Sequence, residues 1–67
     1  MLYLGCFEVE KMYYMDDNYK IDIITHIIEA DNEDEANDKV IRYYAMKDVP
    51  YYVTYLVNKV YINEIIQ

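Results

Sequence analysis

The stretch Ile27-Ile28-Glu29-Ala30-Asp31-Asn32-Glu33-Asp34-Glu35-Ala36 divides the chain into an extended part and a helical part. The residues before Asp31 are dense in Ile, which is typical of a strand, and the acidic residues after it are typical of the first turn of a helix. Either Asp31 or Asn32 can cap that helix. An Asn32 cap places Glu35 at the spacing of a capping box, and an Asp31 cap places Asp34 there.

The predicted helix covers residues 33–47. Apolar residues recur within it at helical spacing, and these are Ala36, Val40, Tyr43 and Tyr44, with Ile41 beside them and Lys47 in the same row. Pro50 disfavours helical geometry at the residue before it, so the helix must end ahead of the proline.

Three strands are predicted around this helix, over residues 2–14, 19–30 and 52–66. The last segment also admits a hairpin that turns at Asn58-Lys59. The order β-β-α-β predicts one α+β domain over residues 1–67. A three-stranded, mainly antiparallel sheet is expected, with the first strand between the other two and the helix on one face.

A three-residue loop, Asp16-Asp17-Asn18 with Asn18 left-handed, predicts a register between the first two strands in which paired residue numbers sum to 34. Odd residues then share one apolar face: Tyr3, Phe7, Val9, Tyr13, Ile21, Ile23 and Ile27, interrupted mainly by Lys11 and Thr25. On the even face, His26 is placed opposite Glu8 and near Glu10.

Composition excludes several classes of protein. Thirteen acidic residues against six basic ones give a net charge of -7, which repels phosphate and argues against direct nucleic-acid binding. Cys6 and His26 are each alone, so we expect no intrachain disulfide, no zinc site and no cofactor. Without a signal peptide or a long apolar run, we expect a soluble cytoplasmic protein.

Two groups of residues are candidates for binding a protein partner. The acidic residues Glu33, Asp34, Glu35 and Asp38 form either a solvated helix start or a patch for a basic surface. They do not fit a calcium loop, because Ala36 stands where the EF-hand needs Gly. Ten of 67 residues are Tyr, which indicates either an interface or an AT-rich genome. We take Tyr14 and Tyr52 as partner-binding residues.

His26 with Glu8 and Glu10 can be a general base or an ordinary polar pair on the open sheet face. The sequence offers no nucleophile or oxyanion donor beside them, and Cys6 lacks an activating base. We therefore predict no catalytic residues and no enzymatic activity.

The segment Ile28 to Ala36 resembles the strand-to-helix junction of small β-β-α-β proteins encoded by phages and other mobile elements. This group includes anti-CRISPR and other anti-defence proteins. The resemblance implies inhibition of a host protein by binding, in the cytoplasm of a host cell, and transfers no individual functional residue.

Three hypotheses follow. The first is a non-enzymatic viral inhibitor that binds a host defence protein, which itself can be a nucleic-acid-binding one. The second is a structural homo-oligomer, with a homodimer expected, formed through edge strands or the uncovered sheet face. The third is a small-ligand or nucleotide sponge with a Tyr-lined pocket between protomers, which at this net charge requires local Lys or Arg42.

Overall fold

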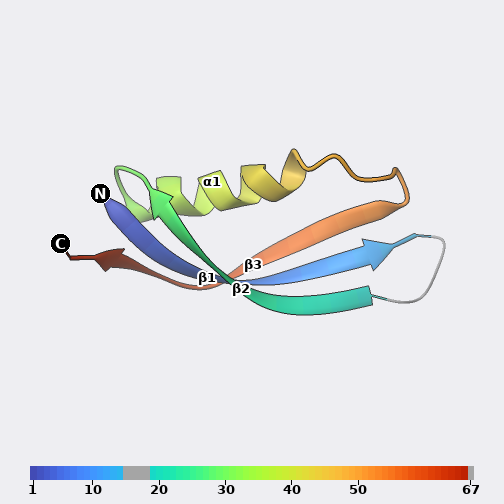
Figure 1. Ribbon diagram of the computed structural model, residues 1–67, viewed down its shortest axis with the longest axis horizontal. Coiled ribbons are helices and arrows are strands. Elements are labelled where there is room, and N and C mark those ends of the chain that lie inside the picture. The colour runs from blue at the N-terminus through green and yellow to red at the C-terminus, as the bar shows by residue number, and fades with distance from the viewer. Residues whose placement is uncertain (15–18, 67) are drawn as a thin grey trace.

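The computed structural model describes residues 1–14 and 19–66. Within them the elements are β1 (Leu2–Tyr13), β2 (Tyr19–Glu29), α1 (Glu33–Ala45) and β3 (Val53–Ile65). The strands form one sheet in the order β2-β1-β3, and β1 is antiparallel to both neighbours. The helix lies along one face of this sheet (Figure 1). The predicted α+β fold, with β1 central and residues 53–65 as one strand, is confirmed.

The start of α1 agrees with one of the two predicted caps. The side chain of Asn32 accepts a hydrogen bond from the backbone N–H of Glu35 at 2.8 Å, which satisfies a donor that the first helical turn leaves free. The helix ends at Ala45, two residues before the predicted end. Met46 and Lys47 instead donate their backbone N–H groups to Arg42 and Tyr44, which closes the last turn.

The predicted register between β1 and β2 is wrong. The loop expected to set it, Asp16-Asp17-Asn18, lies outside the described residues, but the paired numbers sum to 31 rather than 34, from Leu2–Glu29 to Met12–Tyr19. An odd sum pairs odd residues of β1 with even residues of β2. The helix-covered face therefore combines Tyr3, Phe7 and Val9 with Ile24 and Ile28.

Three isoleucines move to the other face as a consequence. The predicted register places Ile21, Ile23 and Ile27 on the same face as Phe7, whereas in the structure they lie on the opposite face and are 43%, 63% and 71% exposed. The even residues of β2 face the helix instead. Ile28 is buried in the core under α1, and His26 is hydrogen-bonded to Tyr44 of the helix.

A bulge in β3 changes which of its residues face the helix. Cys6 pairs with Tyr61 whereas Phe7 pairs with Lys59, so Val60 is an extra residue in the strand. Before the bulge the odd residues Val53, Tyr55 and Val57 lie on the helix side. After it the even residue Ile62 is buried on the helix side, and the odd residues Tyr61 and Ile65 lie on the opposite face.

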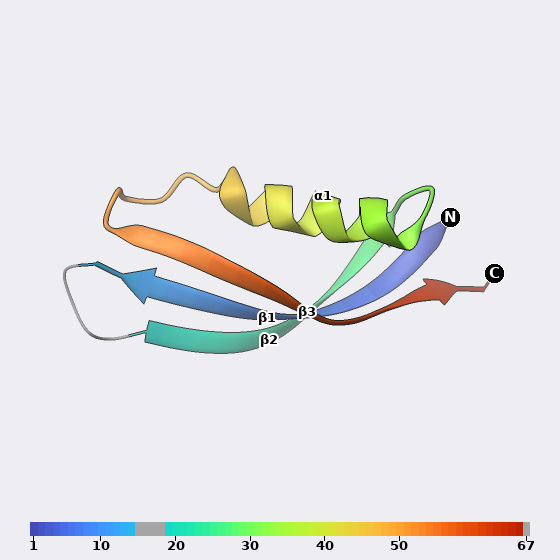
Figure 2. The same ribbon diagram turned by 180° about the vertical axis from the view of Figure 1, so that it is seen from behind.

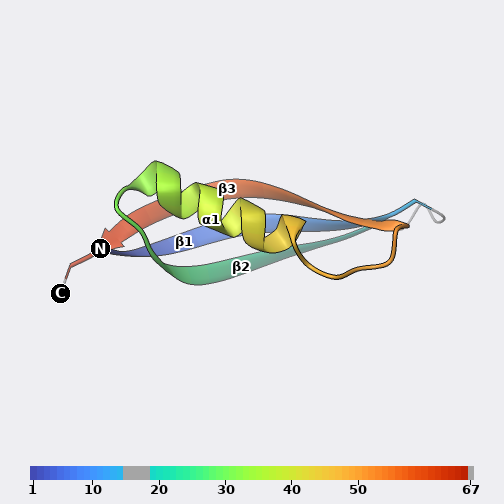
Figure 3. The ribbon, with the colours of Figure 1, turned by 90° about the horizontal axis from the view of Figure 1, so that it is seen from above.

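The helix is much shorter than the sheet that it covers. Thirteen helical residues span about 20 Å, whereas twelve residues of β1 span about 40 Å. The helix lies over the half of the sheet that holds the N-terminus, as the views from behind and from above show (Figure 2 and Figure 3). Beyond its last turn, residues 46–52 run on toward the far end of the sheet. The molecule is accordingly elongated, 45 Å by 19 Å by 14 Å.

The core lies under α1 and is centred on Phe7, which is fully buried. It consists of the following residues: Tyr3, Phe7, Val9, Ile28, Ala30, Ala36, Val40, Tyr44 and Ile62. Gly5 makes room for the Phe7 ring, because a Cβ at this position would lie 2.5 Å from Phe7 Cε2 and 3.2 Å from Ile28 Cδ1.

We predict that Gly5→Ala lowers the free energy of unfolding by about 2 kcal/mol, because the added methyl has no space beside the buried ring. Ordinary strand preference gives the opposite sign, since Ala normally stabilises a strand relative to Gly. Urea denaturation followed by circular dichroism measures the difference. In a Phe7→Leu background, which lacks the clashing ring atoms, the cost of Gly5→Ala should shrink; an equal cost in both backgrounds contradicts the packing explanation.

We also predict that Asn32→Ala destabilises the chain by about 1 kcal/mol through loss of the helix cap. Asp31→Ala is the matched control, because it removes a neighbouring acidic side chain and leaves the cap in place. The same denaturation experiment compares the two variants. A larger loss for Asp31→Ala contradicts the assignment of the cap.

Candidate functional site

The predicted partner-binding residues divide between the two ends of the molecule. Glu33, Asp34, Glu35 and Asp38 lie in the first turns of α1, beside the start of β1, where the backbone N–H of Ala30 donates to the carbonyl of Met1. Tyr14 and Tyr52 lie together at the far end, where the N–H of Tyr14 donates to the carbonyl of Tyr52 at 2.8 Å (Figure 1). The structure therefore does not bring the acidic and aromatic residues into one site.

Part of the acidic charge is compensated within the chain. Glu35 lies 3.5 Å from the ammonium of Lys39, and Glu33 lies 3.7 Å from that of Lys59. Both pairs are exposed, so each contributes little to stability. Asp34 and Asp38 are exposed on the same helix.

The predicted polar group of Glu8, Glu10 and His26 is also wrong, because the register places them on opposite faces of the sheet. His26 pairs with Gly5 and lies on the helix side, whereas Glu8 pairs with Ile23 on the uncovered side. The true partner of His26 is Tyr44, with 2.9 Å between the imidazole Nε2 and the phenol oxygen.

Aromatic rings surround His26. Its ring packs edge to face against those of Phe7, Tyr43 and Tyr44, with centroids 5.7 to 6.0 Å apart. Burial lowers the pKa of His26, and the nearby Lys47 ammonium lowers it further. Burial likewise raises the pKa of the Tyr44 hydroxyl. Both groups are therefore held neutral at neutral pH, as befits a structural hydrogen bond.

The uncovered face of the sheet is the first candidate surface. It is formed by alternate residues of the three strands: Leu2, Leu4, Cys6, Glu8, Glu10, Met12, Tyr19, Ile21, Ile23, Thr25, Ile27, Glu29, Thr54, Leu56, Asn58, Tyr61, Asn63 and Ile65. The helix α1 and the segments that join it to β2 and β3 lie on the other side (Figure 2). Several large apolar residues of this face are exposed. A continuous exposed apolar surface on a small protein is typical of a binding site.

The charges on the uncovered face have one sign. Glu8 lies between Ile23 and Asn58, and Glu10 lies between Ile21 and Leu56. Among the described residues this face carries no Lys or Arg. The strand lysines (Lys11, Lys20 and Lys59) are on the helix side, and the remaining bases (Lys39, Arg42 and Lys47) belong to α1 or directly follow it.

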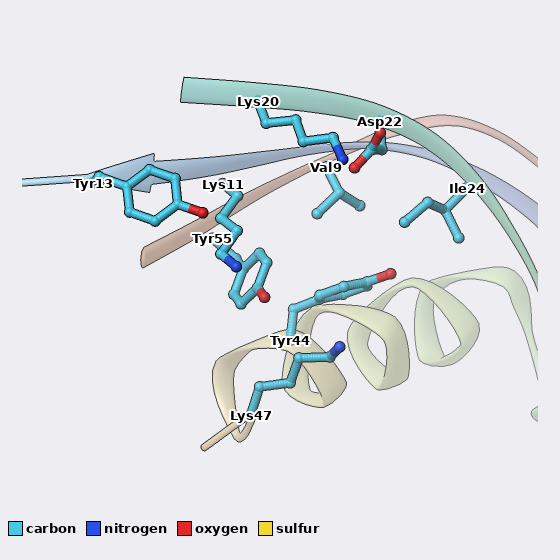
Figure 4. A pocket seen from close by; sticks show the side chains of 9 residues that line it. All are labelled: Val9, Lys11, Tyr13, Lys20, Asp22, Ile24, Tyr44, Lys47 and Tyr55. Carbon is cyan, nitrogen blue, oxygen red and sulfur yellow. The ribbon is translucent and has the colours of Figure 1, made fainter. Parts of the chain in front are cut away.

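A cavity of about 330 Å³ on the helix side is the second candidate site. It lies where α1 ends and the sheet continues. Lys11, Lys20 and Lys47 reach it from β1, from β2 and from the residue after the helix C-cap (Figure 4). Asp22 is the one acidic residue among the described residues that line it.

The remaining walls of this cavity are aromatic and apolar. Tyr13, Tyr44 and Tyr55 contribute rings, and Val9 and Ile24 contribute aliphatic side chains (Figure 4). One indication of this site is visible in the sequence, since Lys11 interrupts a mainly apolar strand face. The predicted register placed Lys20 and Lys11 on opposite faces, whereas the two residues pair directly in the structure. The sequence pattern likewise did not indicate that Lys47 lies near them.

Residues 1–14 and 19–66 contain no group of three or more His, Cys, Asp or Glu side chains arranged to hold a metal ion. In the same part of the chain, no helix has the length and apolar character that crossing a membrane requires. Comparison with known proteins gives no match to a family model, to a curated protein or to a solved structure.

We predict that the free energy of unfolding declines as the pH falls below about 6.5, the ordinary pKa of histidine. Because the folded-state pKa of His26 is lowered, the unfolded chain binds the proton more readily. The contribution of His26 to the free energy of unfolding is therefore complete above the ordinary pKa of histidine. It is lost as the pH falls toward the lower pKa that His26 has in the folded chain.

Urea denaturation at a series of pH values measures this dependence. His26→Gln should remove it, whereas Tyr44→Phe should retain most of it, because burial is the main cause and the ring stays in place. An unchanged pH dependence in His26→Gln contradicts the assignment to His26.

Proposed function

We propose that this chain is a small non-enzymatic binding protein that acts by contact between its uncovered face and another protein. The observation that carries the proposal is the composition of that face. Exposed apolar residues surround Glu8 and Glu10 there, and none of the described Lys or Arg residues lies on it. The partner has matching chemistry: an apolar surface with Lys or Arg side chains opposite Glu8 and Glu10.

Charge favours a different protein over a second copy of the chain as the occupant. Two uncovered faces stacked on each other bring carboxylates from both copies into the interface and supply no described base to either. Each copy also carries a net charge of -7. The predicted homo-oligomer is therefore the alternative, and the experiment below distinguishes the two.

The resemblance to phage-encoded accessory proteins adds a biological role to the proposal, namely action inside a host cell. There the contact inhibits a host defence protein, and a nucleic-acid-binding target has the basic surface that the uncovered face requires. The binding surface proposed here is the uncovered sheet face rather than the acidic start of α1.

Variants on the uncovered face test the proposal. Ile23 and Ile27 are mostly exposed, so Ile23→Ser and Ile27→Ser should leave the fold intact and weaken binding about tenfold or more. Glu8→Gln and Glu10→Gln should weaken binding and reduce its sensitivity to salt. The tagged chain is used to isolate its partner from cells that naturally express it, and the affinity is then measured with purified components by calorimetry.

The matched controls are Asp34→Asn and Asp38→Asn, which remove the same charges from the exposed helix surface. These controls should bind as the native chain does. Binding that depends on Asp34 and Asp38 but not on Glu8 and Ile27 contradicts the proposal. A dimer in sedimentation velocity that Ile27→Ser converts to a monomer also contradicts it, because a second copy then covers the face.

A further inference from the structure

The cavity beyond the end of α1 gathers the positive charge of a strongly acidic protein. Among the described residues, three lysines and one aspartate line it, so these lining side chains carry a formal charge of +2 where the whole chain carries -7. Lysines normally spread over a surface to reduce their mutual repulsion. Their convergence from three different segments indicates a complementary anion.

Tyrosine rings hold two of these ammonium groups in place without neutralising them. Lys47 Nζ lies over the rings of Tyr43, Tyr44 and Tyr55, at 5.2, 5.4 and 5.7 Å from their centroids. Lys11 Nζ lies 5.4 Å from the centroid of the Tyr13 ring. A cation–π contact orients a lysine but leaves its full charge, so both groups are positioned to bind an anion.

The charged state of Lys11 is reinforced by its neighbours. Hydrogen bonding to the Tyr13 hydroxyl raises the pKa of Lys11, and nearby Tyr55 acts in the same direction. Lys11 is therefore protonated at neutral pH. The ammonium remains available to a ligand because its bonding to a neutral phenol is weaker than bonding to an anion.

The rest of the cavity suits a flat ring rather than a bare ion. The rings of Tyr44 and Tyr55 lie 5.6 Å apart and are tilted to each other, and Val9 and Ile24 supply an aliphatic wall. Tyrosine faces bind planar heterocycles by stacking. A volume of about 330 Å³ is at the lower end for small-molecule sites and exceeds what an inorganic ion fills.

We propose that this cavity binds a small phosphorylated ligand with a flat ring, the chemistry of a nucleoside monophosphate. Lys11, Lys20 and Lys47 contact the phosphate, and the ring lies against the half-buried Tyr55, which packs on the buried Tyr44. The site lies within one copy of the chain and on the opposite side of the sheet from the uncovered face. It is therefore independent of the protein-binding function proposed above.

Titration of the native chain with AMP, GMP, CMP and UMP at low salt, followed by NMR chemical shifts, tests the proposal. At least one nucleotide should bind saturably and shift the signals of Tyr44 and Tyr55. The corresponding nucleoside and inorganic phosphate, tested as separate probes, should each bind about tenfold more weakly or less, because each retains only part of the contacts.

Lysine variants locate the site. Lys20→Gln and Lys47→Gln should each weaken nucleotide binding about tenfold, whereas Lys39→Gln and Lys59→Gln remove the same charge outside the cavity and should leave it unchanged. The lysine stems are exposed, so all four variants should retain the native fold, which circular dichroism verifies.

Three results would overturn the proposal. The first is the absence of saturable binding for all of the nucleotides. The second is inorganic phosphate that binds as tightly as a nucleotide, which removes the role of the rings. The third is equal weakening by the cavity and control variants, which reduces the effect to overall charge. None of these results bears on the uncovered face, so the two proposals fail separately.

Discussion

The mismatch in length between one short helix and a long sheet determines most of this structure. The helix spans about 20 Å of a sheet whose central strand spans about 40 Å, so only half of one sheet face is covered. The covered half holds the core around Phe7. On the helix side, the part of the sheet beyond the end of α1 forms the Lys-lined cavity. The opposite side, the uncovered face, has no helix on it among the described residues. Both candidate sites therefore arise from what the helix leaves open.

The junction at Asp31-Asn32 was predictable because its information is local. A helix cap depends on the residues that directly follow it, and Asn32 with Glu35 have the required spacing. The order of the strands followed from the same junction, since a helix between β2 and β3 makes these two parallel and leaves β1 as their common antiparallel neighbour.

The register of β2 was not predictable in the same way. Isoleucine occurs at odd and even positions of this strand, at Ile21, Ile23 and Ile27 and at Ile24 and Ile28, so its apolar pattern does not select a face. What selects the face is contact with α1, through the Tyr44 hydroxyl and the burial of Ile28. The bulge at Val60 escaped prediction for a related reason, since β3 is also apolar at both parities. These two errors hid the cavity and the true composition of the uncovered face.

The position of β1 in the middle of the sheet also affects how the chain reaches its fold. Leu2 pairs with Ile65, and the buried Ile62 completes the core around Phe7 from the opposite end of the sequence. The chain as far as Ile62 must consequently leave the ribosome before the hydrophobic interior can close. Until then β1 and β2 expose apolar side chains on both faces, and the nascent chain is most prone to aggregation during this interval.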